Sequence, residues 1–279
     1  MTRGSAPRLL HAGLVALASV TIALGFPPSS GGDTAPPLPN SMASLGDSIT
    51  RAYNACGFFS DCTARSWSTG NDAAVNSHYQ RIRKKNEALT AHNVARSGAK
   101  VDELEDQAAS AVFQGVEYVT ILVGANDACT SSESDMTSLV TFEERFRAAV
   151  ETLTEELPEA ALFVSSIPDI KKLWLVGKDE PDARNAWEAF DICQSILANP
   201  TSTDPADEAR RDRVRRRVID YNDVLEEACL DHRSCKFDEN AVFSYPFTLG
   251  HVSRWDYFHP NATGQAVLAD VTYRKGFGW

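Results

Sequence analysis

No apolar run in the sequence is long enough for an ordinary membrane-spanning helix. Such a helix needs about 20 consecutive apolar residues, whereas the longest run, Leu9 to Leu24, has about 16 and is interrupted by His11. No cysteine follows the run, which argues against a lipoprotein anchor, and no Arg-Arg pair precedes it. We therefore expect no stable membrane anchor, with retention of this run as an anchor as the alternative.

The same run has the features of an export signal. Arg3 and Arg8 form a short basic region before it, and Ala23-Leu24-Gly25 places small residues where a signal peptidase cleaves. The stretch from Phe26 to Asn40 is rich in proline, glycine and serine, a composition typical of a disordered spacer. The expected organisation is a signal peptide at 1–25, a linker at 26–40 and one large domain at 41–279. We expect the mature protein to be secreted.

Positive charge is also scarce. The 27 lysines and arginines are outnumbered by 38 aspartates and glutamates, which gives a formal net charge of −11. An acidic protein has no general attraction for nucleic acid or for an anionic membrane. The one basic cluster, Arg210 to Arg217, lies on a helical pattern among acidic residues, so we interpret it as a solvated helix face. We expect a monomer that binds no nucleic acid.

Paired C-x-x-C motifs and clustered histidines are absent, so we expect no metal site. The six cysteines of a chain with an export signal most simply form three disulfides, although other pairings are formally open. Two pairs of cysteines are close in the sequence and indicate short local loops, which leaves the third pair. The expected disulfides are Cys56–Cys62, Cys129–Cys193 and Cys229–Cys235.

The Gly-x-Ser-x-Gly motif of α/β-hydrolases is absent, but a different strand-end serine is present. The apolar run Met42 to Leu45 predicts a buried strand, and Gly46, Asp47 and Ser48 follow it. A strand that ends in this way and turns into a helix brings the Ser48 hydroxyl to the carboxyl end of a sheet. Reacting groups usually lie there in open α/β sheets. The alternative is that Asp47 or Ser48 only caps the helix.

A base for this serine occurs near the other end of the sequence. Asp256 and His259 are three residues apart, so in a tight turn the carboxylate reaches the imidazole Nδ1. A serine becomes a good nucleophile when a base takes its proton and a third group orients the base. Pro260 then ends the turn, and we expect Thr263 to cap a last helix from Gly264 to about Tyr273.

Two further polar positions follow predicted strands. Gly98 comes shortly after Asn93-Val94-Ala95 and can bring a bare backbone N–H close to a substrate. Asn126 follows the apolar run Tyr118 to Val123, and its amide can donate toward developing negative charge. The alternative for each is an ordinary turn, in which glycine and asparagine are common.

Strand-like and helical patterns alternate along the domain. Such alternation predicts an α/β fold with a parallel sheet covered by helices on both faces. The expected strands are Met42–Leu45, Ala91–Val94, Tyr118–Val123 and Ala161–Ile167, and the expected helices are Tyr79–Ala88, Val101–Val112, Phe142–Leu157 and about Arg210–Cys229. Trp174 and Trp187 follow the fourth strand, and we expect them to pack against a long loop rather than to line an acyl groove.

Four short motifs occur in a fixed order: Gly-Asp-Ser48, Asn-x-Ala-x-x-Gly98, Gly-x-Asn126-Asp and Asp256-x-x-His259. Together they resemble the SGNH (GDSL) hydrolase superfamily, with Ile49-Thr50 in place of the leucine of the GDSL name. The stretches Ser66-Trp67-Ser68-x-Gly70, Asn93-Val94-Ala95 to Gly98-Ala99 and Asn126-Asp127-Ala128-Cys129 are most similar to its phospholipase-B-like branch. The resemblance covers roughly residues 41–276, except about 170–235, and implies a three-layer α/β/α, flavodoxin-like fold.

The resemblance implies a serine ester hydrolase that needs no cofactor. Ser48 would be the nucleophile, His259 the general base and Asp256 the group that orients it. The backbone N–H groups of Ser48 and Gly98 and the Asn126 side chain would form the oxyanion hole. We expect an acyl-lipid or short-chain ester as substrate. The alternatives are a carbohydrate O-acetylesterase and, outside enzymes, a non-catalytic secreted binding protein on the same scaffold.

Overall fold

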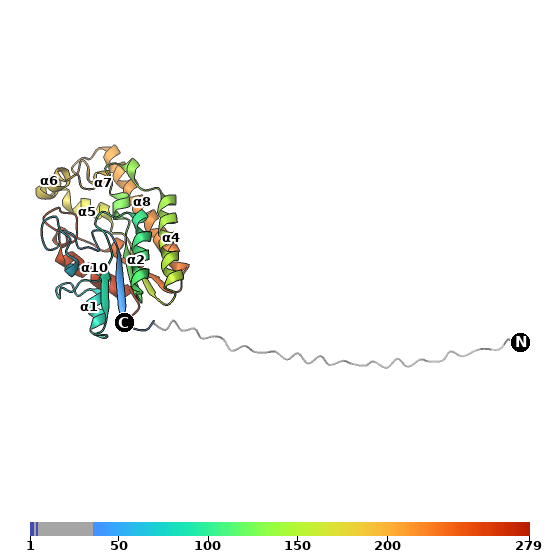
Figure 1. The fold of residues 1–279 in the computed structure, drawn as a ribbon. Helices are drawn as coiled ribbons and strands as arrows, with labels where there is room; N and C mark the ends of the chain where they lie inside the picture. The colour runs from blue at the N-terminus through green and yellow to red at the C-terminus, as the bar shows by residue number, and fades with distance from the viewer. Residues whose placement is uncertain (3, 5–35) are drawn as a thin grey trace. The chain divides into compact units, whose positions relative to one another are not determined.

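A parallel sheet of five strands positions the polar motifs (Figure 1). Its strands are β1 (Ser41–Gly46), β2 (Thr90–Asn93), β3 (Tyr118–Leu122), β4 (Ala161–Val164) and β5 (Cys235–Phe237), and their order is β2-β1-β3-β4-β5. The first four strands lie where the sequence predicts them. The fifth was not predicted, because a three-residue strand with an exposed lysine at its centre leaves no apolar run.

The computed structural model describes residues 1, 2, 4 and 36–279. Nearly all of the predicted signal peptide and most of the predicted linker therefore fall outside the described residues. Residues 36–279 belong to one compact unit. In this described part of the chain, no helix has both the length and the apolar composition that crossing a membrane would require.

The strand order changes direction at β1. The chain passes from β1 to β2 on one side, and β3, β4 and β5 follow on the other side. This is the flavodoxin-like order, in which ligands bind beyond the carboxyl ends of the strands at the point of reversal. The motifs of Ser48, Gly98 and Asn126 follow β1, β2 and β3, respectively, so they start from neighbouring strand ends.

Helices cover both faces of the sheet, and the predicted three-layer α/β/α fold is confirmed. Figure 1 shows α2 (Leu104–Gln114), α4 (Leu139–Glu156) and α8 (Pro205–Leu230) on one side and α1 (His78–Arg83) and α10 (Ala262–Lys275) on the other. Shorter helices fill the connections: α3 (Ala125–Ala128), α5 (Ile170–Gly177), α6 (Pro181–Ala189), α7 (Gln194–Leu197) and α9 (Ala241–Ser244). Because both faces are covered, β3 and β4 are buried along their whole length.

Several helix boundaries differ from the sequence prediction, as where α4 and α8 begin at Leu139 and Pro205 rather than at Phe142 and about Arg210. The first predicted helix ends at Arg83, well before Ala88. The last helix begins at Ala262, because Asn261 and not Thr263 is its N-cap: the Asn261 side chain accepts a hydrogen bond from the Gly264 N–H at 3.0 Å. The prediction that Thr263 caps this helix is therefore wrong. Asparagine is the stronger N-cap residue of the two.

The two tryptophans after β4 pack inside the protein, as predicted. Trp174 and Trp187 are both buried. Their indole N–H groups donate to the carbonyl oxygens of Pro200 and Tyr257 at 2.9 and 3.0 Å. A buried indole needs such a partner, and the second bond ties α6 to the loop that carries the predicted Asp256 and His259.

Candidate active site

The turn after β1 depends on Gly46. Its φ is +136°, and a Cβ at this position would lie 2.0 Å from the Leu122 carbonyl oxygen, so only glycine fits. The buried Gln107 side chain holds both backbone groups of Gly46: Oε1 accepts from the N–H at 2.7 Å, and Nε2 donates to the carbonyl at 3.0 Å. The N–H and the carbonyl group of Gly46 are therefore both fixed, two residues before Ser48.

Ser48, His259 and Asp256 form a continuous hydrogen-bonded series. Ser48 Oγ lies 2.8 Å from His259 Nε2, and His259 Nδ1 lies 2.6 Å from Asp256 Oδ2. An ionised carboxylate only accepts hydrogen bonds, so Nδ1 carries the proton and Nε2 accepts from the serine hydroxyl. The geometry gives Ser48 an adjacent base and gives the base an orienting carboxylate, which is how a serine is activated for acyl transfer.

The Asp256 carboxylate is held by several donors besides the imidazole. Oδ1 accepts the N–H groups of Phe258 and His259 at 2.9 and 3.1 Å, and Oδ2 accepts Nδ2 of Asn54 at 2.5 Å. Burial is the largest influence on the pKa of Asp256 and raises it, but the bond and charge of His259 together with the other donors outweigh it. The pKa is lowered overall, so Asp256 stays ionised at neutral pH.

Asn54 is a site residue that the sequence analysis missed. Its side-chain oxygen accepts the Phe59 N–H at 2.6 Å while its amide nitrogen donates to Asp256. It also adopts a left-handed backbone conformation, with φ of 60°, which asparagine tolerates better than most residues. Asn54 and Asp256 are 202 residues apart, and no local pattern in the sequence indicates their contact.

The Gly98 loop and Asn126 are tied to the same edge of the sheet. The Arg96 N–H donates to the Gly46 carbonyl at 3.1 Å, which draws the loop after β2 toward the end of β1. Asn126 Nδ2 donates to the Ala99 carbonyl at 2.9 Å. Gly98 has φ of +87°, a conformation that favours glycine, although the space around it is open. The fold thus brings the polar positions that follow β1, β2 and β3 to one edge.

Three N–H groups at this edge of the sheet can still donate a hydrogen bond. Among the described residues, the backbone N–H groups of Ser48 and Gly98 donate to no partner, and Asn126 Nδ2 uses only one of its two hydrogens. Donors of this kind can stabilise the oxyanion of a tetrahedral intermediate when they surround its position. The sequence prediction named these three groups.

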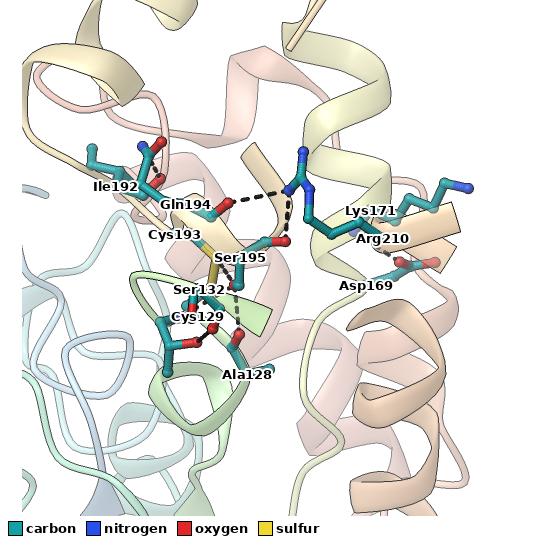
Figure 2. The surroundings of a disulfide bond; sticks show 11 residues. Ala128, Cys129, Ser132, Asp169, Lys171, Ile192, Cys193, Gln194, Ser195 and Arg210 are labelled. Atoms are coloured by element: carbon teal, nitrogen blue, oxygen red, sulfur yellow. Dashed lines mark hydrogen bonds between the residues drawn. A yellow bond between two sulfur atoms is a disulfide. The ribbon is translucent and has the colours of Figure 1, made fainter. Parts of the chain in front are cut away.

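A disulfide anchors the helix that carries Asn126 (Figure 2). Cys129 directly follows α3 and is bonded to Cys193. Ser195 Oγ adds a hydrogen bond to the Ala128 carbonyl at 2.7 Å. The bridge closes a loop of 64 residues, and such a loop stabilises a fold by about 4 kcal/mol in the chain-entropy model. Asn126 is therefore held on a short helix with a covalent attachment at its end.

The other two disulfides are local. The bonds Cys56–Cys62 and Cys229–Cys235 each span six residues, and no described cysteine is free. These are the pairs that the spacing predicts. The first closes the loop that contains Phe59, and the second joins the end of α8 to β5.

The carboxyl groups of Asp47 and Asp127, which follow β1 and β3, are also buried. Burial raises the pKa of Asp47 to about 7, although the Ile49 N–H donates to its Oδ1 at 2.8 Å. Burial also raises the pKa of Asp127 to about 6, against the hydrogen bonds from Thr137 and Val101. Asp47 Oδ2 has no hydrogen-bond partner within the described part of the chain. Each carboxyl group therefore resists ionisation in the folded protein.

This burial predicts how stability changes with pH. A carboxyl group with a raised pKa stabilises the fold at low pH, and its contribution is lost as the pH rises from the ordinary value of 3.8 to about 7 for Asp47. Asparagine cannot ionise. We expect Asp47→Asn to gain stability relative to the unmodified protein over this range, by up to about 1.4 kcal/mol per pH unit. Urea unfolding of both proteins in a pH series measures it, and a constant difference between them would refute the prediction.

An apolar cavity of about 70 Å³ lies next to the hydrogen-bonded series Ser48–His259–Asp256. Its walls come from the turn after Ser48, from α3, from the start of α5 and from both sides of His259, although Ser48 and His259 do not line it. The lining includes Ile49, Ala125, Ile170, Leu173, Phe258 and Pro260.

The described part of the chain offers no candidate metal site. Residues 36–279 and the three described N-terminal residues contain no group of three or more His, Cys, Asp or Glu residues placed to bind a metal ion.

Comparison with known proteins shows which family the chain matches and which solved structures resemble it. The family model of the GDSL-like lipases/acylhydrolases matches residues 42–272. Similar solved structures include the lipase Lip_vut3 from a goat rumen metagenome, with 14% identity, a TM-score of 0.55 and coverage of 85% of this chain and 97% of that chain. TesA has 13% identity, a TM-score of 0.53 and coverage of 84% and 97%.

The acetyl xylan esterase AlAXEase has 14% identity, a TM-score of 0.50 and coverage of 84% of this chain and 98% of that chain. At such identities the solved structures show a common fold and carry no information about substrate. No curated protein sequence matches the chain.

Proposed function

Because the chain belongs to the GDSL-like lipase/acylhydrolase family, we propose that it is a secreted ester hydrolase in which Ser48 attacks the carbonyl carbon of an acyl ester. The hydrogen-bonded series Ser48–His259–Asp256 carries this proposal, since its distances of 2.8 and 2.6 Å suit proton transfer without rearrangement. Hydrolysis of esters is the activity of the family, and the residue roles and the substrate class are the parts that we propose.

The reaction proceeds in two halves. His259 Nε2 takes the Ser48 proton as Oγ bonds to the carbonyl carbon, and the carbonyl oxygen becomes an oxyanion. The N–H groups of Ser48, Gly98 and Asn126 donate to that oxygen. The imidazolium then gives its proton to the departing alkoxide, which leaves as the alcohol. Water repeats the sequence on the acyl-enzyme and releases the acid, and Asp256 remains ionised throughout.

The apolar cavity supports an acyl chain of limited length. By the same volume measure a single water needs about 10–15 Å³, so 70 Å³ accommodates roughly five groups of the size of water or methylene. We therefore propose short to medium acyl esters as substrates that bind with the chain in this cavity. Ala125, Ile170 and Phe258, which line the cavity, would contact the chain.

A chain-length series tests this assignment. We expect kcat/KM for p-nitrophenyl esters, from acetate to palmitate, to peak near butyrate and hexanoate and to fall for longer chains. Leu173 lines the cavity and is only partly buried, so Leu173→Trp should fill the space without disrupting the core. The variant should lose about tenfold or more on hexanoate and less than about threefold on acetate, since losing even one methylene from an apolar pocket costs about 1–3 kcal/mol. Equal losses on both esters would show that the acyl chain does not bind in this cavity.

A carbohydrate O-acetylesterase is the second candidate. It is favoured by a hollow of about 660 Å³ with a largely polar lining, which includes Asn54, Glu180, Asp182 and Asn261. Such side chains suit sugar hydroxyl groups. Phosphatidylcholine and acetyl-xylan, assayed beside the p-nitrophenyl esters, separate the candidates: release of acetate from acetyl-xylan, with no hydrolysis of butyrate or longer esters, would favour the carbohydrate substrate.

Secretion, the phospholipase-B-like branch and a monomeric state complete the proposal. Three disulfides support an oxidising compartment, and the basic and apolar pattern of residues 1–25 supports an export signal. The acidic net charge of −11 supports the absence of nucleic-acid partners. The motifs around Ser68 and Asn126 support the branch assignment.

A further inference from the structure

Four aromatic side chains gather on the surface near the candidate active site. Phe58, Phe59, Phe190 and Trp255 are each 42–53% exposed. The Phe58 ring centroid lies 4.2 Å from that of Phe59 and 5.1 Å from that of Trp255, and the Phe59 centroid lies 5.1 Å from that of Phe190. They come from three segments of the chain, namely the loop closed by Cys56–Cys62, the end of α6 and the turn before His259. We call this group the aromatic patch.

The size of the aromatic patch sets it apart from ordinary exposed apolar residues. Single exposed phenylalanines are common on soluble proteins and need no explanation. Four large rings, each about half exposed, present roughly 300–500 Å² of contiguous apolar surface. This is the size of the largest apolar patch on a typical soluble protein, and such patches are often functional. None of these side chains takes part in the hydrogen-bonded series of Ser48.

The aromatic patch is continuous with the candidate catalytic residues. The Tyr53 ring lies 6.2 Å from the Phe59 ring and 5.0 Å from the His259 ring, measured between centroids. A row of rings thus runs from the catalytic imidazole to the outer surface at Phe58. A surface that covers the patch therefore lies close to the side chains of Tyr53 and His259.

The protein also holds the patch in place. The Cys56–Cys62 disulfide closes the loop that bears Phe58 and Phe59. Within this loop Phe59 has φ of 48°, a conformation that costs free energy for a residue with a side chain. Its N–H is fixed by the Asn54 oxygen at 2.6 Å. The exposed position of Phe58 and Phe59 is therefore fixed by the disulfide and the hydrogen bond of this loop.

We propose that the aromatic patch docks the enzyme on the surface of aggregated lipid with uncharged or zwitterionic headgroups. Aromatic rings partition well into the boundary between headgroups and acyl chains. Docking there would bring His259 and Ser48 close to the layer that contains the ester bonds. This inference rests on the proposed function, because it assumes that the substrate is an acyl ester.

Charge selects the kind of lipid. The residues next to the patch in the sequence carry both signs, with Arg254 beside Trp255 and Asp191 beside Phe190, while Asp61 is paired with Arg51 at 2.9 Å. The chain as a whole carries a formal charge of −11. The net charge gives the protein no general attraction for an anionic membrane, so apolar contact is the main attraction, and a neutral surface does not oppose it.

Vesicle binding tests the proposal without interference from hydrolysis. All proteins carry Ser48→Ala, and flotation with phosphatidylcholine vesicles measures their affinity. We expect Phe58→Ser with Phe190→Ser to weaken binding about tenfold or more. The control is Phe113→Ser: Phe113 is 88% exposed, but it lies at the end of α2, at the opposite edge of the sheet. This control should bind as tightly as the parent. Phe58→Ser alone replaces the double variant if the double variant does not fold.

Hydrolysis with Ser48 intact gives an independent readout. The double variant should hydrolyse dissolved p-nitrophenyl acetate within about threefold of the unmodified rate. It should lose about tenfold on a short-chain phosphatidylcholine above its critical micelle concentration. Unchanged vesicle binding in the double variant, no binding by the parent, or an equal loss in Phe113→Ser overturns the inference.

Other occupants of the patch are also distinguishable. If the parent sediments as a dimer and the double variant as a monomer, the patch belongs to a second copy of the chain, which likewise overturns the inference. Failure of the proposed function would appear separately, as p-nitrophenyl acetate hydrolysis that is absent from the unmodified protein or retained by Ser48→Ala.

Discussion

Ser48→Ala is expected to lower turnover of p-nitrophenyl butyrate by on the order of a million-fold. The substitution removes the atom that bonds to the acyl carbon, so only catalysis by the remaining donors and by substrate binding persists. Stability should change little, because Ser48 Oγ contacts His259 and closes no structural network in the core. Turnover and melting temperature, measured together, test this expectation.

The same experiment has a clear contrary result. A Ser48→Ala protein that melts as the unmodified protein does and keeps more than about one hundredth of its turnover would show that another residue attacks the ester. Helix capping would not explain that result, because residues 48–54 form turns and no helix, and the Ser48 hydroxyl contacts His259.

Asn126→Ala is expected to lower turnover by about a hundred- to a thousand-fold, or about 3–4 kcal/mol of transition-state stabilisation. Substrate affinity should barely change, since the lost N–H donates to charge that exists only in the transition state. The bond from Asn126 to the Ala99 carbonyl is also lost, which should reduce stability by about 1 kcal/mol.

A matched control separates catalysis from turn geometry at Asn126. Asn86 is the first residue of a turn closed by the Leu89 N–H, and its Nδ2 donates to the Pro39 carbonyl at 2.9 Å. It lies before the amino end of β2, at the edge of the sheet away from Ser48. Asn86→Ala should therefore cost stability and leave turnover unchanged. If Asn126→Ala behaves in the same way and keeps more than about a third of its turnover, Asn126 only closes a turn.

The strands and the polar strand ends could be predicted because their signals are local. Met42–Leu45 and Tyr118–Val123 are apolar runs that end in glycine, and the residues that follow lie next to them in the sequence. Parallel strands align their carboxyl ends, so placing Ser48 and Asn126 at one edge required only the fold class. The confirmed fold follows from the alternation of apolar runs and helical patterns.

The residues that support the site could not be predicted in this way. Gln107 holds the Gly46 peptide, and Asn54 holds Asp256, through contacts that span 61 and 202 residues. Each depends on the final packing of helices and loops and leaves no periodicity in the sequence. The aromatic patch could not be predicted from the sequence for the same reason, since Phe58, Phe190 and Trp255 come from separate segments.

The most direct test of the central claim is covalent labelling with a fluorophosphonate, which reacts with an activated serine and mimics the tetrahedral intermediate. Intact-mass measurement followed by peptide mapping should find one adduct per molecule, on Ser48. The adduct should be absent from His259→Ala, because without the imidazole of His259 the hydroxyl keeps its proton. A labelled residue other than Ser48, no adduct on an enzyme that hydrolyses esters, or equal labelling of His259→Ala would contradict the assignment of Ser48 as a nucleophile activated by His259.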